Sequence, residues 1–166
     1  MQTSNFNLKA RKATEDDWKS ILNLLEETQL SYWFVGEENY RNFYITLDNS
    51  NKVINCFAIY LKDNIGLLKQ FAVSNDLQGK GIGTCVANEI LIKVAKELGL
   101  KRLYLQAGNK KPFTSFHFWK KTVFKQIDKE SVKDKYAKEY FDSVEKNLPN
   151  DFFREGSFYV EINSIH

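Results

Sequence analysis

The segment that decides the fold is Asn75-Asp76-Leu77-Gln78-Gly79-Lys80-Gly81-Ile82-Gly83-Thr84, in which three glycines alternate with other residues. An apolar stretch typical of a buried strand, 65–73, precedes it, and residues 84–98 follow with apolar side chains at helical spacing. Alternating glycines let successive backbone N–H groups turn toward one point, where the N-terminus of a helix adds partial positive charge. The segment therefore predicts a phosphate cradle made of backbone, and a glycine-rich turn without a ligand is the alternative.

Two common phosphate-binding motifs do not fit this spacing. A P-loop needs GxxxxGK followed by Ser or Thr, which the segment lacks. A dinucleotide-binding motif needs GxGxxG and an acidic residue near the end of the next strand, but here the spacing is GxGxG and the expected strand 102–106 ends without an acid. A phosphate bound at this segment would therefore belong to another kind of ligand, and a turn without a ligand stays the alternative.

The flanking sequence predicts alternating strands and helices. Three successive apolar stretches separated by turn residues indicate an antiparallel meander, and the helix at 84–98 joins two strands that we expect to be roughly parallel. Thr14 and Asp17 resemble a helix capping box. The expected strands are 6–11, 43–47, 53–61, 65–73, 102–106, 123–127 and 156–162, and the expected helices are 14–29, 36–41, 84–98, 113–121 and 131–146.

Length and composition exclude several classes of protein. The chain has 166 residues, 43% of them hydrophobic, which predicts a single compact domain over 1–166. A net charge of +3 with few arginines argues against a nucleic-acid binder, and no apolar stretch suggests a signal peptide or a membrane span. Two cysteines and two histidines make a metal site or a disulfide framework improbable. We expect a cytoplasmic protein without a metal.

The motif Gln78-Gly79-Lys80-Gly81-Ile82-Gly83 resembles the pyrophosphate-binding signature of the GNAT superfamily of N-acetyltransferases, Gln/Arg-x-x-Gly-x-Gly/Ala. The strand Phe71–Val73 and the loop Ser74–Asp76 are similar to the elements that precede that signature. The segment Phe118–Phe124 resembles the later family motif, aromatic-aromatic-x-Lys-x-Gly-Phe. The resemblance covers about residues 6–127 and implies an α/β fold, with a mixed, twisted central sheet and helices on both faces.

The resemblance also implies acetyl-CoA as the acetyl donor. Its pyrophosphate would rest on backbone N–H groups of 79–84, its pantetheine arm would pair with 71–73, and the main chain near Phe71 or Ala72 would polarise the thioester carbonyl. The implied cofactor-binding residues are Phe71, Ala72, Val73, Gln78, Gly79, Lys80, Gly81, Ile82, Gly83, Thr84, Asn109, Ser115, Phe118 and Lys121.

The usual catalytic side chains of the family are replaced. Many members use a Tyr as the general acid where this chain has Trp119, and an indole N–H does not release a proton at neutral pH. The strand positions at which members often carry a Glu general base hold Leu68, Lys69 and Gln70. The catalytic candidates are Trp119, as a shaping residue, and His117, which can titrate near neutrality. A helix-packing or surface role is the alternative for His117.

The resemblance implies an acceptor site near the first helix, the loop after it and the C-terminal strands. The aromatic residues Tyr32 and Trp33 can line a pocket or hold a cation, although core packing would also explain them. Lys69 and Arg154 are further acceptor-binding candidates, and an ion pair with a neighbouring acid is the alternative for Arg154. The aromatic stretch 115–121 is similar to the amino-acid acetyltransferase branch of the family.

These features predict acetyl transfer from acetyl-CoA to a primary amine of a small molecule, an amino acid or a similar compound. The alternatives are a peptide or protein N-acetyltransferase, a catalytically silent CoA-binding sensor and, more remotely, a dinucleotide oxidoreductase. The expected partner is the small-molecule amine, without nucleic acid or membrane, and the aromatic-rich C-terminal strands are compatible with a homodimer.

Overall fold

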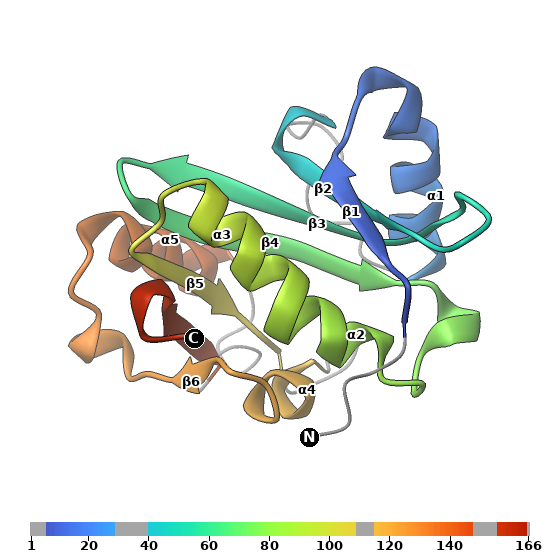
Figure 1. Cartoon of the computed structure of the whole chain (residues 1–166). Coiled ribbons are helices and arrows are strands. Elements are labelled where there is room, and N and C mark those ends of the chain that lie inside the picture. Colours follow the sequence, from blue (N-terminus) through green and yellow to red (C-terminus); the bar gives the residue numbers. More distant parts are fainter. Residues whose placement is uncertain (1–5, 29–39, 109–114, 148–155, 166) are drawn as a thin grey trace. The chain divides into compact units, whose positions relative to one another are not determined.

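The computed structural model describes residues 6–28, 40–108, 115–147 and 156–165 (Figure 1). The strands form a seven-stranded sheet in the order β1-β2-β3-β4-β5-β7-β6. Neighbouring strands are antiparallel in the pairs β1–β2, β2–β3, β5–β7 and β6–β7, and parallel in the pair β4–β5. This mixed sheet with helices confirms the predicted α/β class.

The chain divides into two compact units. The first unit comprises Met1–Ile59 and Lys69–Val86, and the second comprises Tyr60–Leu68 and Ala87–His166. Strands β3 and β4 each contribute residues to both units. The strands are β1 (Lys9–Lys12), β2 (Phe43–Leu47), β3 (Val53–Lys62), β4 (Ile65–Val73), β5 (Arg102–Gln106), β6 (Lys125–Gln126) and β7 (Ser157–Glu161). The α-helices are α1 (Trp18–Glu27), α2 (Ile82–Cys85), α3 (Leu91–Glu97), α4 (Phe116–Lys120) and α5 (Lys135–Asn147).

Short helical turns complete the secondary structure. The 3₁₀ turns η1 (Glu15–Asp17), η3 (Tyr40–Asn42), η4 (Asn75–Leu77), η6 (Lys129–Ser131) and η7 (Ile162–Ser164) lie between the larger elements. A π-helical turn, η5 (Val86–Ile90), joins α2 to α3, so that 82–97 is helical throughout. No helix within the described ranges is long and apolar enough to cross a bilayer.

The predicted capping box at the start of the first helical region is present. The Thr14 N–H donates to Asp17 Oδ2 at 2.7 Å, and the Thr14 hydroxyl lies 3.0 Å from the same oxygen. The Arg11 guanidinium binds the same carboxylate with two hydrogen bonds: Nη1 donates to Asp17 Oδ2 at 2.7 Å and Nη2 donates to Asp17 Oδ1 at 2.9 Å. The hydrogen bonds from Arg11, supported by those from Thr14, lower the pKa of Asp17 from 3.8 to about 2.

We expect Asp17→Asn to lower the free energy of unfolding at pH 7 by about 1 to 2 kcal/mol. The stabilisation from a carboxylate with a lowered pKa is complete above the unfolded pKa near 3.8 and is lost as pH falls through about 2. The difference between wild type and variant should therefore shrink between pH 4 and pH 2, measured by urea unfolding.

The control is Asp142→Asn, because Asp142 pairs with Lys129 while its own side chain is 43% exposed. This variant should change stability much less. A difference between Asp17→Asn and wild type that stays constant down to pH 2 would contradict the assignment.

In the second unit, β4 runs parallel to β5 from the pair Ile65 and Arg102 to the pair Leu68 and Leu105. This confirms the parallel arrangement expected across the helix 84–98. One face of this pair packs against α5 in a cluster that buries Ile65, Leu67, Tyr104, Val132, Ala137 and Phe141. The apolar face of the amphipathic helix α5 is thus buried against strands of the same unit.

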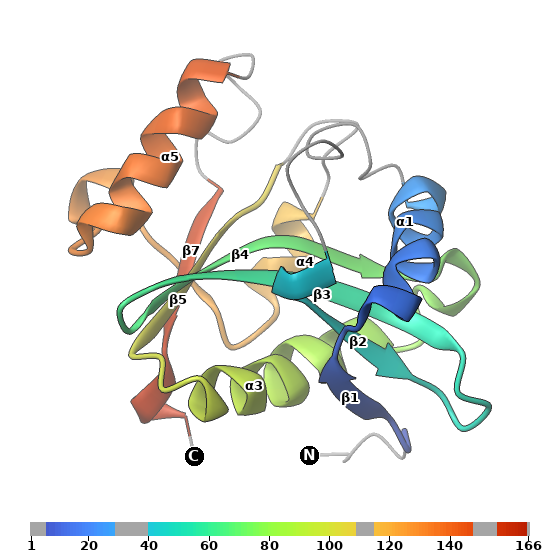
Figure 2. The same ribbon diagram turned by 90° about the horizontal axis from the view of Figure 1, so that it is seen from above.

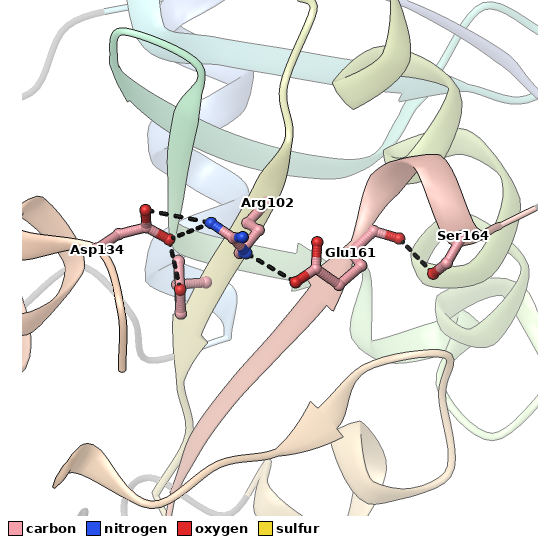
Figure 3. A network of polar contacts seen from close by, with 5 residues as sticks. Arg102, Asp134, Glu161 and Ser164 are labelled. Carbon is pink, nitrogen blue, oxygen red and sulfur yellow. Dashed lines mark hydrogen bonds and ion pairs between the residues drawn. The ribbon is translucent and has the colours of Figure 1, made fainter. Parts of the chain in front are cut away.

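Arg102 joins β5 to β7 and to the start of α5 (Figure 3). Its Nε donates to Glu161 Oε1 at 2.7 Å, and its Nη1 donates to Asp134 Oδ2 at 3.0 Å. The Tyr104 hydroxyl donates to the same Asp134 oxygen at 2.6 Å. Burial, followed by this hydrogen bond, raises the pKa of Tyr104 above its ordinary value, so the hydroxyl stays protonated.

Some elements are shorter than the sequence predicts. β6 contains only Lys125–Gln126 instead of 123–127, because side chains occupy the preceding backbone donors. The Val123 N–H donates to Asn88 Oδ1 at 2.9 Å, and the Phe124 N–H donates to Thr122 Oγ1 at 3.2 Å. The helix expected over 131–146 begins at Lys135, because Asp134 takes the preceding position in the Arg102 network.

Candidate functional site

The glycine-rich segment lies in the first unit as a turn between β4 and α2 (Figure 1). Gly79 has φ +78° and Gly81 has φ +85°, so both adopt the left-handed backbone that side chains disfavour. The first helical hydrogen bond runs from Cys85 N–H to the Gly81 carbonyl at 3.0 Å. The N–H groups of residues 82–84 therefore precede the helical ladder and are suited to an anion.

The side chains of this segment divide between solvent and core. Lys80 and Thr84 are exposed, whereas Ile82 is only 5% exposed and fixes the start of α2. Gly83 lies inside α2 and has helical backbone, so the conformational argument for glycine applies to Gly79 and Gly81 but not to Gly83. The cradle thus depends on two left-handed glycines and one buried anchor.

Two side-chain amides brace the turn. Gln78 Nε2 donates to the Val73 carbonyl at 3.1 Å and to Asn75 Oδ1 at 3.0 Å. Asn75 in turn contacts the end of α1: its N–H donates to Glu27 Oε2 at 2.8 Å, and its Nδ2 donates to the Glu27 carbonyl at 3.0 Å. The Ser74 hydroxyl also donates to the Asp76 carboxylate. The amide of Gln78, expected at the ligand, therefore supports the shape of the turn.

The strand residues expected to hold pantetheine lead directly into this turn. Phe71 and Val73 are half-buried and Ala72 is 2% exposed. The Phe71 ring stacks on Phe57 with centroids 6.4 Å apart, and the Ala72 carbonyl accepts a hydrogen bond from Asn55 Nδ2 at 2.9 Å. Lys69 is half-buried in the same strand. The structure thus brings residues 71–73 and 78–84 together in one unit.

The other candidates lie on or beside α4 in the second unit. Trp119 is 4% exposed, and its ring packs edge-on against Phe124 at 5.2 Å and against Phe118 at 4.9 Å. His117 is exposed, and its ring contacts Phe116 at 5.4 Å. This packing is consistent with a shaping role for Trp119, and its catalytic role stays a prediction.

The two residues that flank α4 are exposed. The Ser115 carbonyl accepts the Trp119 N–H at 3.1 Å, and the Lys121 N–H donates to the Phe118 carbonyl at 3.1 Å. Their proposed contacts with CoA stay predictions. Four further candidates, Tyr32, Trp33, Asn109 and Arg154, lie outside the described residues.

The cysteines and the possible metal ligands among the described residues do not form a further site. Cys56 and Cys85 are both buried and are not joined in a disulfide, and burial raises the pKa of the Cys56 thiol. Within 6–28, 40–108, 115–147 and 156–165, no three His, Cys, Asp or Glu side chains stand together as metal ligands.

Three supporting residues were not anticipated from the sequence: Glu27, Asn55 and Asn75. Asn75 stands three residues before Gln78, the first residue of the signature, and its only local signal for this role is a polar side chain that can cap a turn. Glu27 and Asn55 act through contacts with residues 48 and 17 positions away in the chain, so no local pattern could have found them.

The chain resembles known acetyltransferases in sequence pattern and fold. Residues 8–121 match the model of the acetyltransferase (GNAT) family. No curated protein sequence matches the chain. Among solved structures, N-acetylglutamate synthase from Neisseria gonorrhoeae, complexed with coenzyme A and N-acetyl-glutamate, is 16% identical with a TM-score of 0.69 over 96% of this chain. The match spans 35% of the synthase chain, so this protein corresponds to about a third of that enzyme.

Two other structures are of similar size to this chain. PaiA N-acetyltransferase from Thermoplasma acidophilum, in complex with coenzyme A, is 13% identical with a TM-score of 0.63 over 93% of this chain and 99% of its own. A spermidine N-acetyltransferase chimera from Vibrio cholerae and hSSAT is 16% identical with a TM-score of 0.64 over 95% of this chain and 97% of its own. At these identities the likeness demonstrates the fold.

Proposed function

The chain belongs to the GNAT family of acetyltransferases, and from that premise we propose that it transfers an acetyl group from acetyl-CoA to the primary amine of a small molecule. The observation that carries the proposal is the turn after β4, where Gly79 and Gly81 adopt left-handed backbone immediately before α2. An amino acid or a similar compound is the proposed acceptor. The co-crystallised N-acetyl-glutamate of the synthase and the spermidine named for the chimera support an amine of this size.

The residues present fit a pyrophosphate. Left-handed glycines remove side chains from the turn, and the first turn of a helix supplies N–H groups and positive potential. The exposed ammonium of Lys80 adds a point charge. Acetyl-CoA supplies an activated thioester when bound. The chain's own task is to bind it, to orient the amine and to polarise the carbonyl through the main chain near Phe71 or Ala72.

No acidic residue stands at the strand positions where a general base is expected, since these hold Leu68, Lys69 and Gln70. The amine must then reach the site already neutral, so we expect kcat/KM to rise with pH up to the pKa of the acceptor. The lack of an acidic general base at these positions also favours a second candidate function, a CoA-binding sensor without turnover.

A thiol-release assay separates these functions. Wild-type protein is mixed with acetyl-CoA and, in turn, with L-glutamate, L-lysine, spermidine, kanamycin and a short peptide. Faster release with one small amine supports the proposal, and release only with the peptide favours a peptide N-acetyltransferase. CoA binding by calorimetry without release for any amine favours the sensor, and absence of CoA binding contradicts both.

We expect Trp119→Phe to keep kcat within about threefold of wild type, because the role proposed for Trp119 is shape and not proton donation. Phenylalanine preserves the edge-on contact with Phe124. The pH–rate profile should also stay unchanged. A folded Trp119→Phe protein that loses more than about 100-fold in kcat would show that the indole N–H acts directly.

The proposal extends to the domain organisation, the location and the oligomeric state of the protein. A single acetyltransferase domain over residues 1–166 is supported by the family match to 8–121, which includes residues of both compact units. A cytoplasmic location and a homodimer stay predictions.

A further inference from the structure

Gln70 in β4 carries a buried polar group to which none of the described residues donates a hydrogen bond. The residue is only 6% exposed, and its Oε1 accepts no hydrogen bond from any of the described residues. A buried carbonyl oxygen normally has a donor, because leaving it unpaired destabilises the folded chain. An exception in a strand that leads into the cofactor turn therefore calls for a ligand or a water.

The neighbouring strand β3 provides the contrast. Asn55 is a buried carboxamide in the same unit, and both ends of its amide are used. Its Oδ1 accepts from the Thr46 hydroxyl at 2.8 Å, and its Nδ2 donates to the Ala72 carbonyl at 2.9 Å. Within the described part of this unit, one buried amide is thus satisfied inside the sheet and the carbonyl of the other has no donor.

The register of the sheet determines which face carries Gln70. Tyr44 is the partner of Phe57 and stacks on it at 5.5 Å, and Phe57 stacks on Phe71 at 6.4 Å, so the three rings share one face. Successive side chains of a strand point to opposite faces, which places Gln70 on the other face.

That other face is the one that α1 covers. Phe43 precedes Tyr44 and therefore shares the face of Gln70, and its ring contacts Trp18 of α1 at 5.6 Å. Figure 2 shows α1 on one side of β2 and β3. With the acceptor bound beside the first helix, as the family resemblance implies, Gln70 would lie on the acceptor side of β4.

We propose that Gln70 Oε1 accepts a hydrogen bond from the N–H of the acceptor amine and so holds the nitrogen beside β4. This inference rests on the proposed function and assigns an acceptor-binding residue to it. A neutral carboxamide does not take up a proton, so Gln70 orients the amine and leaves the nitrogen lone pair available for attack.

The first test measures stability and needs no ligand. Gln70→Met keeps the length of the side chain and removes the unpaired carbonyl, so the midpoint of urea unfolding should stay equal to that of wild type or rise. Asn55→Leu is the matched control: it removes an amide whose bonds are made, and its midpoint should fall. A fall for Gln70→Met comparable to that of Asn55→Leu would overturn the proposal, because it would mean that a water or the fold itself uses the amide.

The second test measures kinetics with whichever amine of the thiol-release panel gives the highest rate. Gln70→Met should raise the amine KM roughly tenfold while the Kd of CoA stays unchanged. Gln70→Glu restores an oxygen acceptor and adds a base, so it should recover the amine KM and extend activity to lower pH. An unchanged amine KM in Gln70→Met, or a pH profile unaltered in Gln70→Glu, would contradict the assignment.

Failure of the two proposals can be told apart. If wild-type protein binds CoA but acetylates no amine in the panel, the proposed function fails. The stability comparison then decides by itself whether Gln70 is an unsatisfied group kept for a ligand or an ordinary structural residue.

Discussion

Gly81→Val is expected to weaken CoA binding by roughly 100-fold or more, while the protein stays folded. Gly81 has φ +85°, which a β-branched residue adopts only under strain, and relief of that strain would rotate the N–H groups that form the cradle. A valine side chain would also occupy space at the mouth of the turn, where the ring of Phe6 already lies 3.8 Å from the position of a Cβ. Calorimetry with CoA measures the effect directly.

Gly99→Val is the matched control for this prediction. Gly99 follows α3 with φ +71° and has no atom within 4 Å of a Cβ, so valine there carries a similar backbone strain without touching the cradle. Its stability should fall to a similar extent, and its CoA affinity should match that of wild type. Equal CoA affinity in Gly81→Val and wild type would exclude the turn as the pyrophosphate site.

Gly156→Ala is expected to cost on the order of 3 kcal/mol of unfolding free energy. The antiparallel pairing of β5 with β7 continues past Gln106 and Ser157, because the Ala107 N–H donates to the Gly156 carbonyl at 2.7 Å. A Cβ on Gly156 would overlap the Ala107 carbonyl oxygen and lie 2.9 Å from its carbonyl carbon. Neither backbone can move without separating the strands.

The comparison for Gly156→Ala is Gly79→Ala. Gly79 has φ +78° but nothing within 4 Å of a Cβ, so alanine there costs only the left-handed backbone, roughly 1 kcal/mol. Urea unfolding of both variants measures the difference. Equal stabilities would mean that the close approach of Gly156 to Ala107 is not rigid.

Local sequence was sufficient to predict the turn after β4 and most of the strands around it. The strands 43–47, 65–73 and 102–106 have the predicted bounds, because apolar residues between turn residues identify a strand without reference to its partners. The glycine spacing predicted a glycine-rich turn, and Gly79 and Gly81 there adopt left-handed backbone, which glycine enters with less strain than most residues that carry a Cβ. The capping box was also predictable, because Thr14 and Asp17 are only three residues apart in the chain.

Only the tertiary structure decided the roles that depend on distant partners. Position 156 requires glycine because a Cβ there would overlap the carbonyl oxygen of Ala107. No sequence pattern near residue 156 predicts this contact. Gln70 and Asn55 both carry a carboxamide. The Asn55 amide is hydrogen-bonded to Thr46 and Ala72, whereas no described residue donates to the Gln70 carbonyl oxygen. Hydrogen-bond satisfaction depends on neighbours in three dimensions. The sequence by itself therefore determined the glycine-rich turn at which we propose that CoA binds, and only the structure singled out Gln70 as the proposed acceptor-binding residue.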